Sequence, residues 1–287
     1  MDALNSIATA FNSNLLMNGI LMPAFLCLVM YVVYRKRDEL TRHAIQNTAA
    51  TLVVAFMNFG IALLFYNDIN RFLQRLYDSV GIPTLNEAFW DGWPLLLVAL
   101  VGIVVKDFAD YWNHRLMHTD WGWPTHAAHH SDTHVNAFTT YRVHFFEAIV
   151  MSTSYIVLLT WLQMPKAIPI VVMFGAVHNM YVHMNLPYTH GPFKYVLASP
   201  AFHRWHHADV EAAYGKNLAN IIPLWDRLFG TWYYPGLCED EMGAKKTGVE
   251  DKNPFIIFAY PILEWSRMVR TKLGAQRHAA QSPQTDP

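Results

Sequence analysis

Charged side chains are scarce in this chain of 287 residues. Aspartate, glutamate, lysine and arginine make up 15% of it, hydrophobic residues make up 53%, and the formal net charge is −1. A surface that binds nucleic acid needs clustered basic residues to contact the phosphates. The charge balance therefore argues against a nucleic-acid partner.

Cysteine is also nearly absent. Cys27 and Cys238 are far apart and form no CxxC or Cys/His pattern, so neither a disulfide framework nor a zinc finger is indicated. The chain has no GxGxxG loop and no haem-attachment motif. Residues 1–14 lack the positively charged start of a signal peptide. If the chain is a redox enzyme, its electrons must come from a separate carrier.

Long uncharged stretches are present instead. Residues 15–34 and 47–66 contain no charged side chain, and each has the roughly 20 residues that a helix needs to cross a membrane. We expect two transmembrane helices there, rather than buried helices of a soluble core. A shorter apolar run, 93–105, follows Phe89 and Trp90, which could form an interfacial belt, so it could also span.

Two further apolar runs, 148–164 and 167–182, are separated by Pro165 and Lys166. This pattern predicts a tight hairpin of two short, re-entrant helices. The segment between the first two predicted spans carries four basic residues, Arg35, Lys36, Arg37 and Arg42. By the positive-inside rule this segment is cytoplasmic. Of the 15 histidines, 13 lie within residues 114–207, which the predicted topology places at the cytoplasmic ends of the spans.

The histidines recur at regular spacings. His114 and His118 are four residues apart, which places them on one face of a helix. Asp110 lies four residues earlier. It either accepts a hydrogen bond from the second ring nitrogen of His114, as carboxylates beside metal-bound imidazoles do, or is an ordinary helix charge.

Two triplets share one spacing: HAAHH at residues 126–130 and HRWHH at 203–207. On a helix the first histidine shares a face with the second and with the third, whereas adjacent histidines diverge by about 100°. One turn can therefore supply ligands to two metal ions. A lone histidine pair is weak evidence, but three such motifs in order indicate a metal site. Imidazole affinity alone favours copper or zinc over iron, so the spacing does not select the metal.

These motifs, followed by WDRLFGTWYYP at residues 225–235, resemble the fatty acid hydroxylase and sterol desaturase superfamily of membrane di-iron oxygenases. The resemblance covers roughly residues 95–235 and includes YRVHFFE (141–147) and VHMNLP (182–187). It implies metal ligands at His114, His118, His126, His129, His130, His203, His206 and His207, with His178 and His183 as candidates for one or two more. His144 either touches metal or supports the site from outside with Glu147, while His134 and His190 are expected in loops or helix caps.

The expected architecture is an all-α, multi-pass integral membrane protein. About four transmembrane helices or half-spans would carry a cytoplasmic helical cap that holds the di-metal site. Residues 1–90 would form the N-terminal transmembrane part, 91–237 the catalytic domain, and 238–287 a C-terminal part. In that last part, residues 253–273 are expected on the membrane surface and 274–287 to be disordered.

The resemblance implies an enzyme that uses two Fe²⁺ ions and O2 to oxidise a C–H bond of a membrane lipid, a fatty acyl chain or a sterol. Hydroxylation is favoured over desaturation. The electron donor would be a separate cytochrome b5-like or ferredoxin-like carrier with its reductase, docking on the cytoplasmic face.

Two other functions remain as alternatives. A histidine-rich metal transporter would place its ligands within the spans, whereas the predicted spans contain no charged residue. A catalytically inert membrane scaffold would be expected to have lost a motif histidine, and all eight are present. Both alternatives are therefore disfavoured.

Overall fold

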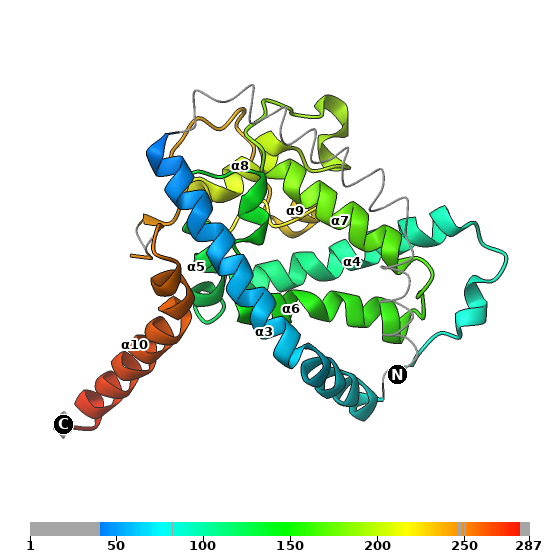
Figure 1. Ribbon diagram of the computed structural model, residues 1–287, viewed down its shortest axis with the longest axis horizontal. Coiled ribbons are helices and arrows are strands. Elements are labelled where there is room, and N and C mark those ends of the chain that lie inside the picture. The colour runs from blue at the N-terminus through cyan, green and yellow to red at the C-terminus, as the bar shows by residue number, and fades with distance from the viewer. Residues whose placement is uncertain (1–40, 82, 246–247, 250, 282–287) are drawn as a thin grey trace, which may run out of the picture.

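The structure is a computed structural model that describes residues 41–281, apart from residues 82, 246–247 and 250. These residues form an all-helical body, as predicted (Figure 1). The only β pairing within the described residues is an isolated bridge between Ala208 and Met242.

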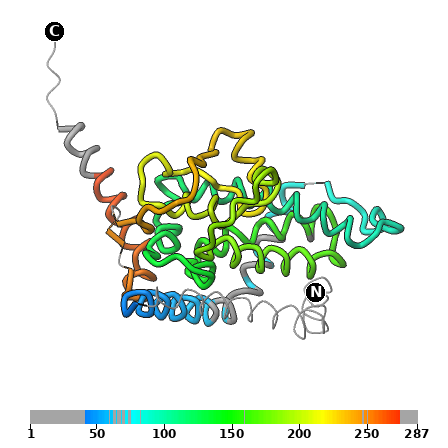
Figure 2. Tube along the Cα trace, turned by 90° about the horizontal axis from the view of Figure 1, so that it is seen from above, coloured from blue at the N-terminus to red at the C-terminus, as the bar shows by residue number. Residues whose placement is uncertain are grey.

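The longest helix, α3 (Arg42–Val80), crosses the front of the body in Figure 1. It begins where the Thr41 side chain accepts a hydrogen bond from the Ala44 backbone amide at 3.1 Å. It ends at Gly81, whose positive φ of 66° closes the last turn. The C-terminal helix α10 (Pro254–Gln281) packs against α3 and α5 and then leads away from the body, as Figure 2 shows.

Three helices form the centre: α4 (Leu95–Met117), α6 (Phe145–Ile156) and α7 (Ile168–Val182). Helix α4 contacts both of the others, and α6 continues into a π-helical turn, η5 (Val157–Trp161). At Gly102 of α4, a Cβ atom would lie 2.9 Å from a methyl group of Val171 on α7. Glycine therefore permits the close approach of α4 and α7.

Short helices surround this centre, and two of them carry the histidine triplets. The short helices are η3 (Glu87–Trp90), α5 (Trp123–His130), η4 (Ala137–Tyr141), η6 (Gly191–Tyr195), α8 (Pro200–His207), η7 (Glu211–Ala213) and α9 (Leu224–Phe229). Helix α8 starts at Pro200, after Ser199, whose side chain accepts from the Phe202 amide. Helix α5 contacts α4, and α8 contacts α7, so both triplets are anchored to the central helices.

The described part of the chain differs from the predicted spans. Among the described residues, no helix combines the length and the apolar composition that crossing a membrane requires. Residues 47–66 are only the middle of α3, and residues 95–105 begin a helix whose later turns carry charged side chains. The predicted pair of short helices on either side of Pro165 and Lys166 is present as α6, with 12 residues, and α7, with 15 residues. The stretch 15–34 lies outside the described residues.

The predicted disorder of residues 274–287 is also wrong in part. Helix α10 continues through Gln281, because residues 274–281 (GAQRHAAQ) are rich in alanine, glutamine and arginine, which are good helix formers. Residues 282–287 lie outside the described residues.

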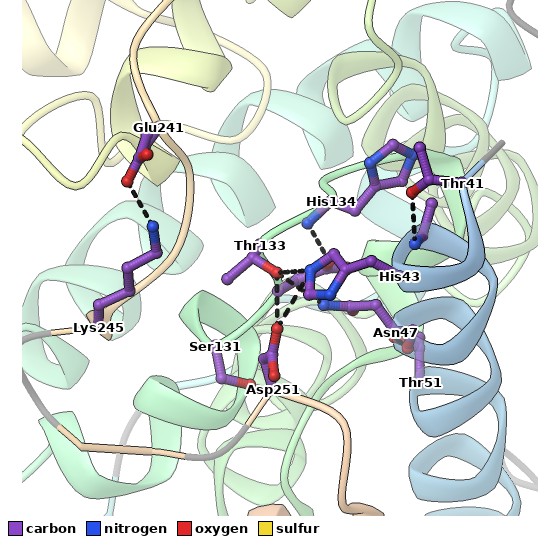
Figure 3. A network of polar contacts seen from close by, with 12 residues as sticks. Thr41, His43, Asn47, Thr51, Ser131, Thr133, His134, Glu241, Lys245 and Asp251 are labelled. Carbon is purple, nitrogen blue, oxygen red and sulfur yellow. Dashed lines mark hydrogen bonds and ion pairs between the residues drawn. The ribbon is translucent and has the colours of Figure 1, made fainter. Parts of the chain in front are cut away.

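A polar network ties the start of α3 to the segment before α10 (Figure 3). Thr133 Oγ1 donates to Asp251 Oδ2 at 2.8 Å, and it accepts from Asn47 Nδ2 at 3.0 Å. His43 Nε2 lies 2.8 Å from the same hydroxyl oxygen. Since the single hydroxyl proton goes to Asp251, His43 is the donor of its bond.

Arg142 extends this connection into the core. Its side chain is fully buried, and the guanidinium donates to Asn47 Oδ1 (2.7 Å), Ser131 Oγ (2.7 Å) and the Asp251 carbonyl (2.6 Å). One side chain therefore joins α3, the end of α5 and the chain that leads into α10.

We expect Arg142→Met to destabilise the protein by about 3 kcal/mol or more, because several buried acceptors lose their donor at once. Thermal unfolding of the purified protein measures this. The matched control is Arg71→Met, since Arg71 forms an exposed ion pair with Asp68 and its loss should cost at most about 1 kcal/mol. Equal melting temperatures for the two variants would contradict the anchoring role of Arg142.

Candidate metal centre

Nine of the ten predicted histidine ligands gather in two groups. The first group is His114, His118, His126, His130 and His206; the second is His129, His183, His203 and His207. Within each group, one nitrogen from each ring lies within 4.8 Å of the others. All of these rings are buried except that of His118, which is partly buried. The helices thus bring together residues from four separate segments.

Each triplet is divided between the two groups. On α5, His126 and His130 belong to the first group and His129 to the second; on α8, His203 and His207 belong to the second and His206 to the first. The first and third histidines are four residues apart and lie about 40° apart around the helix, while the middle one lies about 60° from the first on the other side. One turn therefore contributes to both groups, as predicted. The first and second histidines also lie side by side, as expected, with ring centres 5.2 Å apart in both triplets, although they belong to different groups.

More ring nitrogens converge in the second group than hydrogen bonds can pair. His183 Nδ1 lies 2.6 Å from the Asn179 carbonyl oxygen, so Nδ1 carries the proton and Nε2 offers only a lone pair. Three other Nε2 atoms approach that lone pair, from His203 at 3.0 Å and from His129 and His207 at 3.2 Å. A single lone pair can accept only one of them.

A metal ion accounts for this arrangement. Nitrogen ligands about 2.1 Å from an ion lie about 3.0–3.4 Å from one another, for octahedral or tetrahedral angles. The first group has the same spacing, with Nε2 atoms 2.9 Å apart for His114 and His126 and 3.0 Å apart for His130 and His206. The donor set of each group therefore fits one metal ion.

Partners outside the groups fix the orientation of the rings. His114 Nδ1 donates to the Leu218 carbonyl at 2.7 Å, and His206 Nδ1 donates to the Lys216 carbonyl at 2.8 Å. His126 Nδ1 lies 2.8 Å from Glu147 Oε1. Such contacts hold Nε2 toward a metal and select the tautomer that can bind it.

Burial keeps the rings neutral. It lowers the pKa of His114 and of His183 to about 4. For the other seven clustered histidines, burial first and neighbouring histidines second hold the pKa well below its usual value. Since the neutral imidazole is the form that binds metal, the groups are ready to accept ions at pH 7.

Three of the predicted site residues, Asp110, His144 and His178, lie outside both histidine groups. Asp110 forms an ion pair with Lys106 and accepts from Ser154 Oγ at 2.5 Å, so of its two alternatives the structure favours the helix charge over the bond to His114. The His114 ring turns its Nδ1 toward the 218 loop instead. His144 caps α6 by accepting from the Phe146 amide at 3.2 Å, and its Nε2 lies 3.0 Å from the Phe258 carbonyl.

His178 lies outside both groups. It is five residues before His183 on α7, which turns it about 140° away around the helix axis. The structure therefore does not support its prediction as a metal ligand, whereas His183 is a full member of the second group. The predictions for His134 and His190 hold: His134 follows a loop, and His190 precedes the short helix η6 with a left-handed φ of 58°.

Two buried aspartates hold the loop at residues 216–222, which carries the carbonyl partners of His114 and His206. Asp226 accepts from the amides of Leu218 (2.7 Å) and Ala219 (3.0 Å), and Asp107 accepts from the amides of Ile221 and Ile222, each at 2.8 Å. The sequence analysis missed Asp107. Asp107 and Asp110 are two acidic residues in the largely apolar helix α4, and this pattern could have indicated that both are buried and hydrogen-bonded.

We expect Asp226→Asn to weaken metal binding by about 10- to 100-fold, the usual cost of disturbing the partners of metal ligands. Asparagine offers one acceptor oxygen in place of two, so the loop must lose a bond that holds the Leu218 carbonyl in place. Metal titration against a competing chelator measures the affinity. The control Asp240→Asn makes the same change at an exposed carboxylate, and equal affinities in the two variants would contradict this role.

Two cavities reach the histidines. One, of about 440 Å³, is lined by members of both groups, among them His114, His129 and His203, and by residues of α4, α6 and α7. The other, of about 390 Å³, is lined by His118, His130 and His206 of the first group, with Trp123 and Tyr214. The larger cavity touches both candidate metal positions.

Comparison with known proteins agrees with this site. Residues 99–231 match the family described as fatty acid hydroxylase. This match and the histidine groups confirm the resemblance inferred from the sequence motifs. Over these residues, the chain is similar to the fatty acid hydroxylase family.

Several curated relatives are similar over part of the chain. Ornithine lipid hydroxylase OlsE of Rhizobium tropici is 32% identical over 164 residues, which are 55% of this chain and 49% of the relative. Alkylglycerol monooxygenase of Xenopus tropicalis is 28% identical over 62% of this chain and 37% of the relative. The human alkylglycerol monooxygenase is 28% identical over 50% of this chain and 32% of the relative. The chain thus spans half or less of these relatives, and no solved structure matches it.

Proposed function

We propose that this protein is an O2-dependent di-iron enzyme that hydroxylates a C–H bond of a membrane lipid. The observation that carries the proposal is the pair of buried, neutral histidine groups that share the wall of one cavity. The fatty acid hydroxylase family match, and relatives named as a lipid hydroxylase and monooxygenases, support a lipid as the substrate.

Two ferrous ions, when bound, would activate O2 and remove hydrogen from an unactivated C–H bond. The nine clustered histidines hold these ions through neutral nitrogens. Glu147 orients His126, and the Leu218 and Lys216 carbonyls orient His114 and His206. A lipid in the larger cavity would lie beside members of both groups.

We further propose that the protein works at the membrane with its site on the cytoplasmic face. Large apolar side chains lie exposed on α3, α4 and α10, including Phe56 (76%), Leu96 (75%) and Phe255 (69%). Exposed apolar surface of this kind is suited to contact with lipid. Residues 15–34 are proposed as a transmembrane helix, and residues 91–237 as the catalytic domain.

The chain lacks a recognisable binding motif for a redox cofactor. We therefore propose a separate electron donor, a cytochrome b5-like or ferredoxin-like carrier with its reductase. It would supply the two electrons that hydroxylation with O2 requires, because one oxygen atom enters the lipid and the other leaves as water.

The function can be tested with labelled oxygen. The full chain is expressed in a host without such enzymes, supplied with ¹⁸O2 and an electron donor, and the extracted lipids are analysed by mass spectrometry. A lipid that gains one ¹⁸O atom supports hydroxylation, and a lipid that loses two hydrogens without label indicates desaturation. Unchanged lipids of every class would contradict the proposal and return attention to the transporter and scaffold alternatives.

A further inference from the structure

The cavity that is lined by members of both histidine groups is also lined by polar side chains that belong to neither group. They include Lys106, Asp110, Tyr155 and His178. A pure hydrocarbon chain cannot use such groups, and burying them costs free energy unless they are paired. These polar side chains therefore favour binding of a polar part of a lipid over binding of its hydrocarbon tail.

Two of these residues form an ion pair on α4. Lys106 Nζ contacts Asp110 Oδ2, and Lys106 also lies 4.6 Å from the centre of the Tyr155 ring. The pair is buried, with 8% of Lys106 and 2% of Asp110 exposed. Asp110 and Lys106 precede His114 by four and eight residues, which is about 6 and 12 Å along the helix axis. The cavity thus offers a donor and an acceptor one or two turns from the metal ligands.

His178 contributes from α7. Its ring stacks on Phe174, with ring centres 5.8 Å apart and an angle of 5° between the planes, and only 6% of the residue is exposed. The Asn220 backbone lies beside the ring, but Nε2 has no hydrogen-bond partner among the described residues. A buried polar atom in the wall of a cavity is expected to bond with what the cavity binds.

We infer that this cavity binds the polar end of the lipid, with His178 hydrogen-bonded to a hydroxyl or amide group a few carbon atoms from the C–H bond that reacts. This inference rests on the proposed function. A neutral group that both donates and accepts suits the Lys106–Asp110 pair. Because Lys106 and Asp110 neutralise each other, a carboxylate or an ammonium group would find no net opposite charge beside the pair and would lie close to one like charge. The enzyme therefore oxidises its lipid near the headgroup and not in the middle of a tail.

Binding of tritiated 1-hexadecanol to the full chain in detergent tests this without requiring turnover. Unlabelled 1-hexadecanol should compete about tenfold better than hexadecane, the value of one good hydrogen bond. Hexadecanoate should also compete poorly. His178→Phe keeps the stacked ring but removes the polar atom, so it should weaken 1-hexadecanol binding by about tenfold.

Two further variants separate this role from a structural one. His178→Gln retains a hydrogen-bonding group and should keep most of the affinity, and His134→Phe makes the phenylalanine change at a histidine outside the cavity and should have little effect. Equal competition by hexadecane, or unchanged binding by His178→Phe, would overturn the inference. Failure of the proposed function would instead leave this binding preference intact while no lipid gains ¹⁸O.

Discussion

Replacing His206 or His129 by alanine is expected to abolish lipid oxidation while the protein still folds. His206 belongs to the first histidine group and His129 to the second, so each change removes a ligand from a different metal ion. Disturbing a partner of a metal ligand typically costs about 10- to 100-fold, and losing the ligand itself should cost more. Activity is measured as ¹⁸O incorporation per mole of folded protein.

The matched control for these variants is His134→Ala, because His134 is a histidine outside both groups that lies close to α5 in the sequence. It should retain near-normal activity. Metal content separates the variants further: His206→Ala and His129→Ala should each hold about one ion less than the unchanged protein. Full turnover in either variant would contradict the assignment of these ligands.

Removing the metal is expected to lower thermal stability as well as activity. The two groups bury nine imidazoles whose nitrogens converge, and structural metal sites of this kind contribute folding free energy when filled. We expect chelation to lower the melting temperature by about 10 °C or more, the effect of a few kcal/mol on a domain of this size. Differential scanning calorimetry before and after chelation measures the change.

Restoring individual metals tests the chemistry behind this effect. Zinc should restore stability, because it binds the same nitrogen ligands, but it has no redox chemistry and should not restore oxidation. Ferrous iron should restore both properties. A melting temperature that does not respond to chelation would show that the histidine groups are held together by the helices alone.

Much of this site could be predicted from the sequence because helical spacing is regular. The i, i+4 relation of His126 and His130, and of His203 and His207, follows from 3.6 residues per turn, and the structure keeps each of these pairs in one group. The same geometry explains why His178 lies outside both groups, since a side chain five residues before His183 projects from another face of the helix. The all-helical class followed from the long apolar runs and from the family resemblance.

Other features could not be predicted. The partners of His114 and His206 are the backbone carbonyls of Leu218 and Lys216, and every residue has such a carbonyl, so no residue type marks it. The bounds and packing of the helix that contains residues 47–66 could not be predicted either. Composition shows that a segment avoids charge, but only the structure shows that residues 47–66 are the middle of a helix of 39 residues that packs on α10 and α6.

The metal content of the purified full chain tests the central claim most directly. Elemental analysis of protein prepared without added chelator, from cells supplied with iron, should find about two iron ions per chain, one for each histidine group. X-ray absorption at the iron edge should show coordination mainly by nitrogen. Protein that is folded but binds no metal, or one ion per chain, would contradict a di-iron centre formed by these nine histidines.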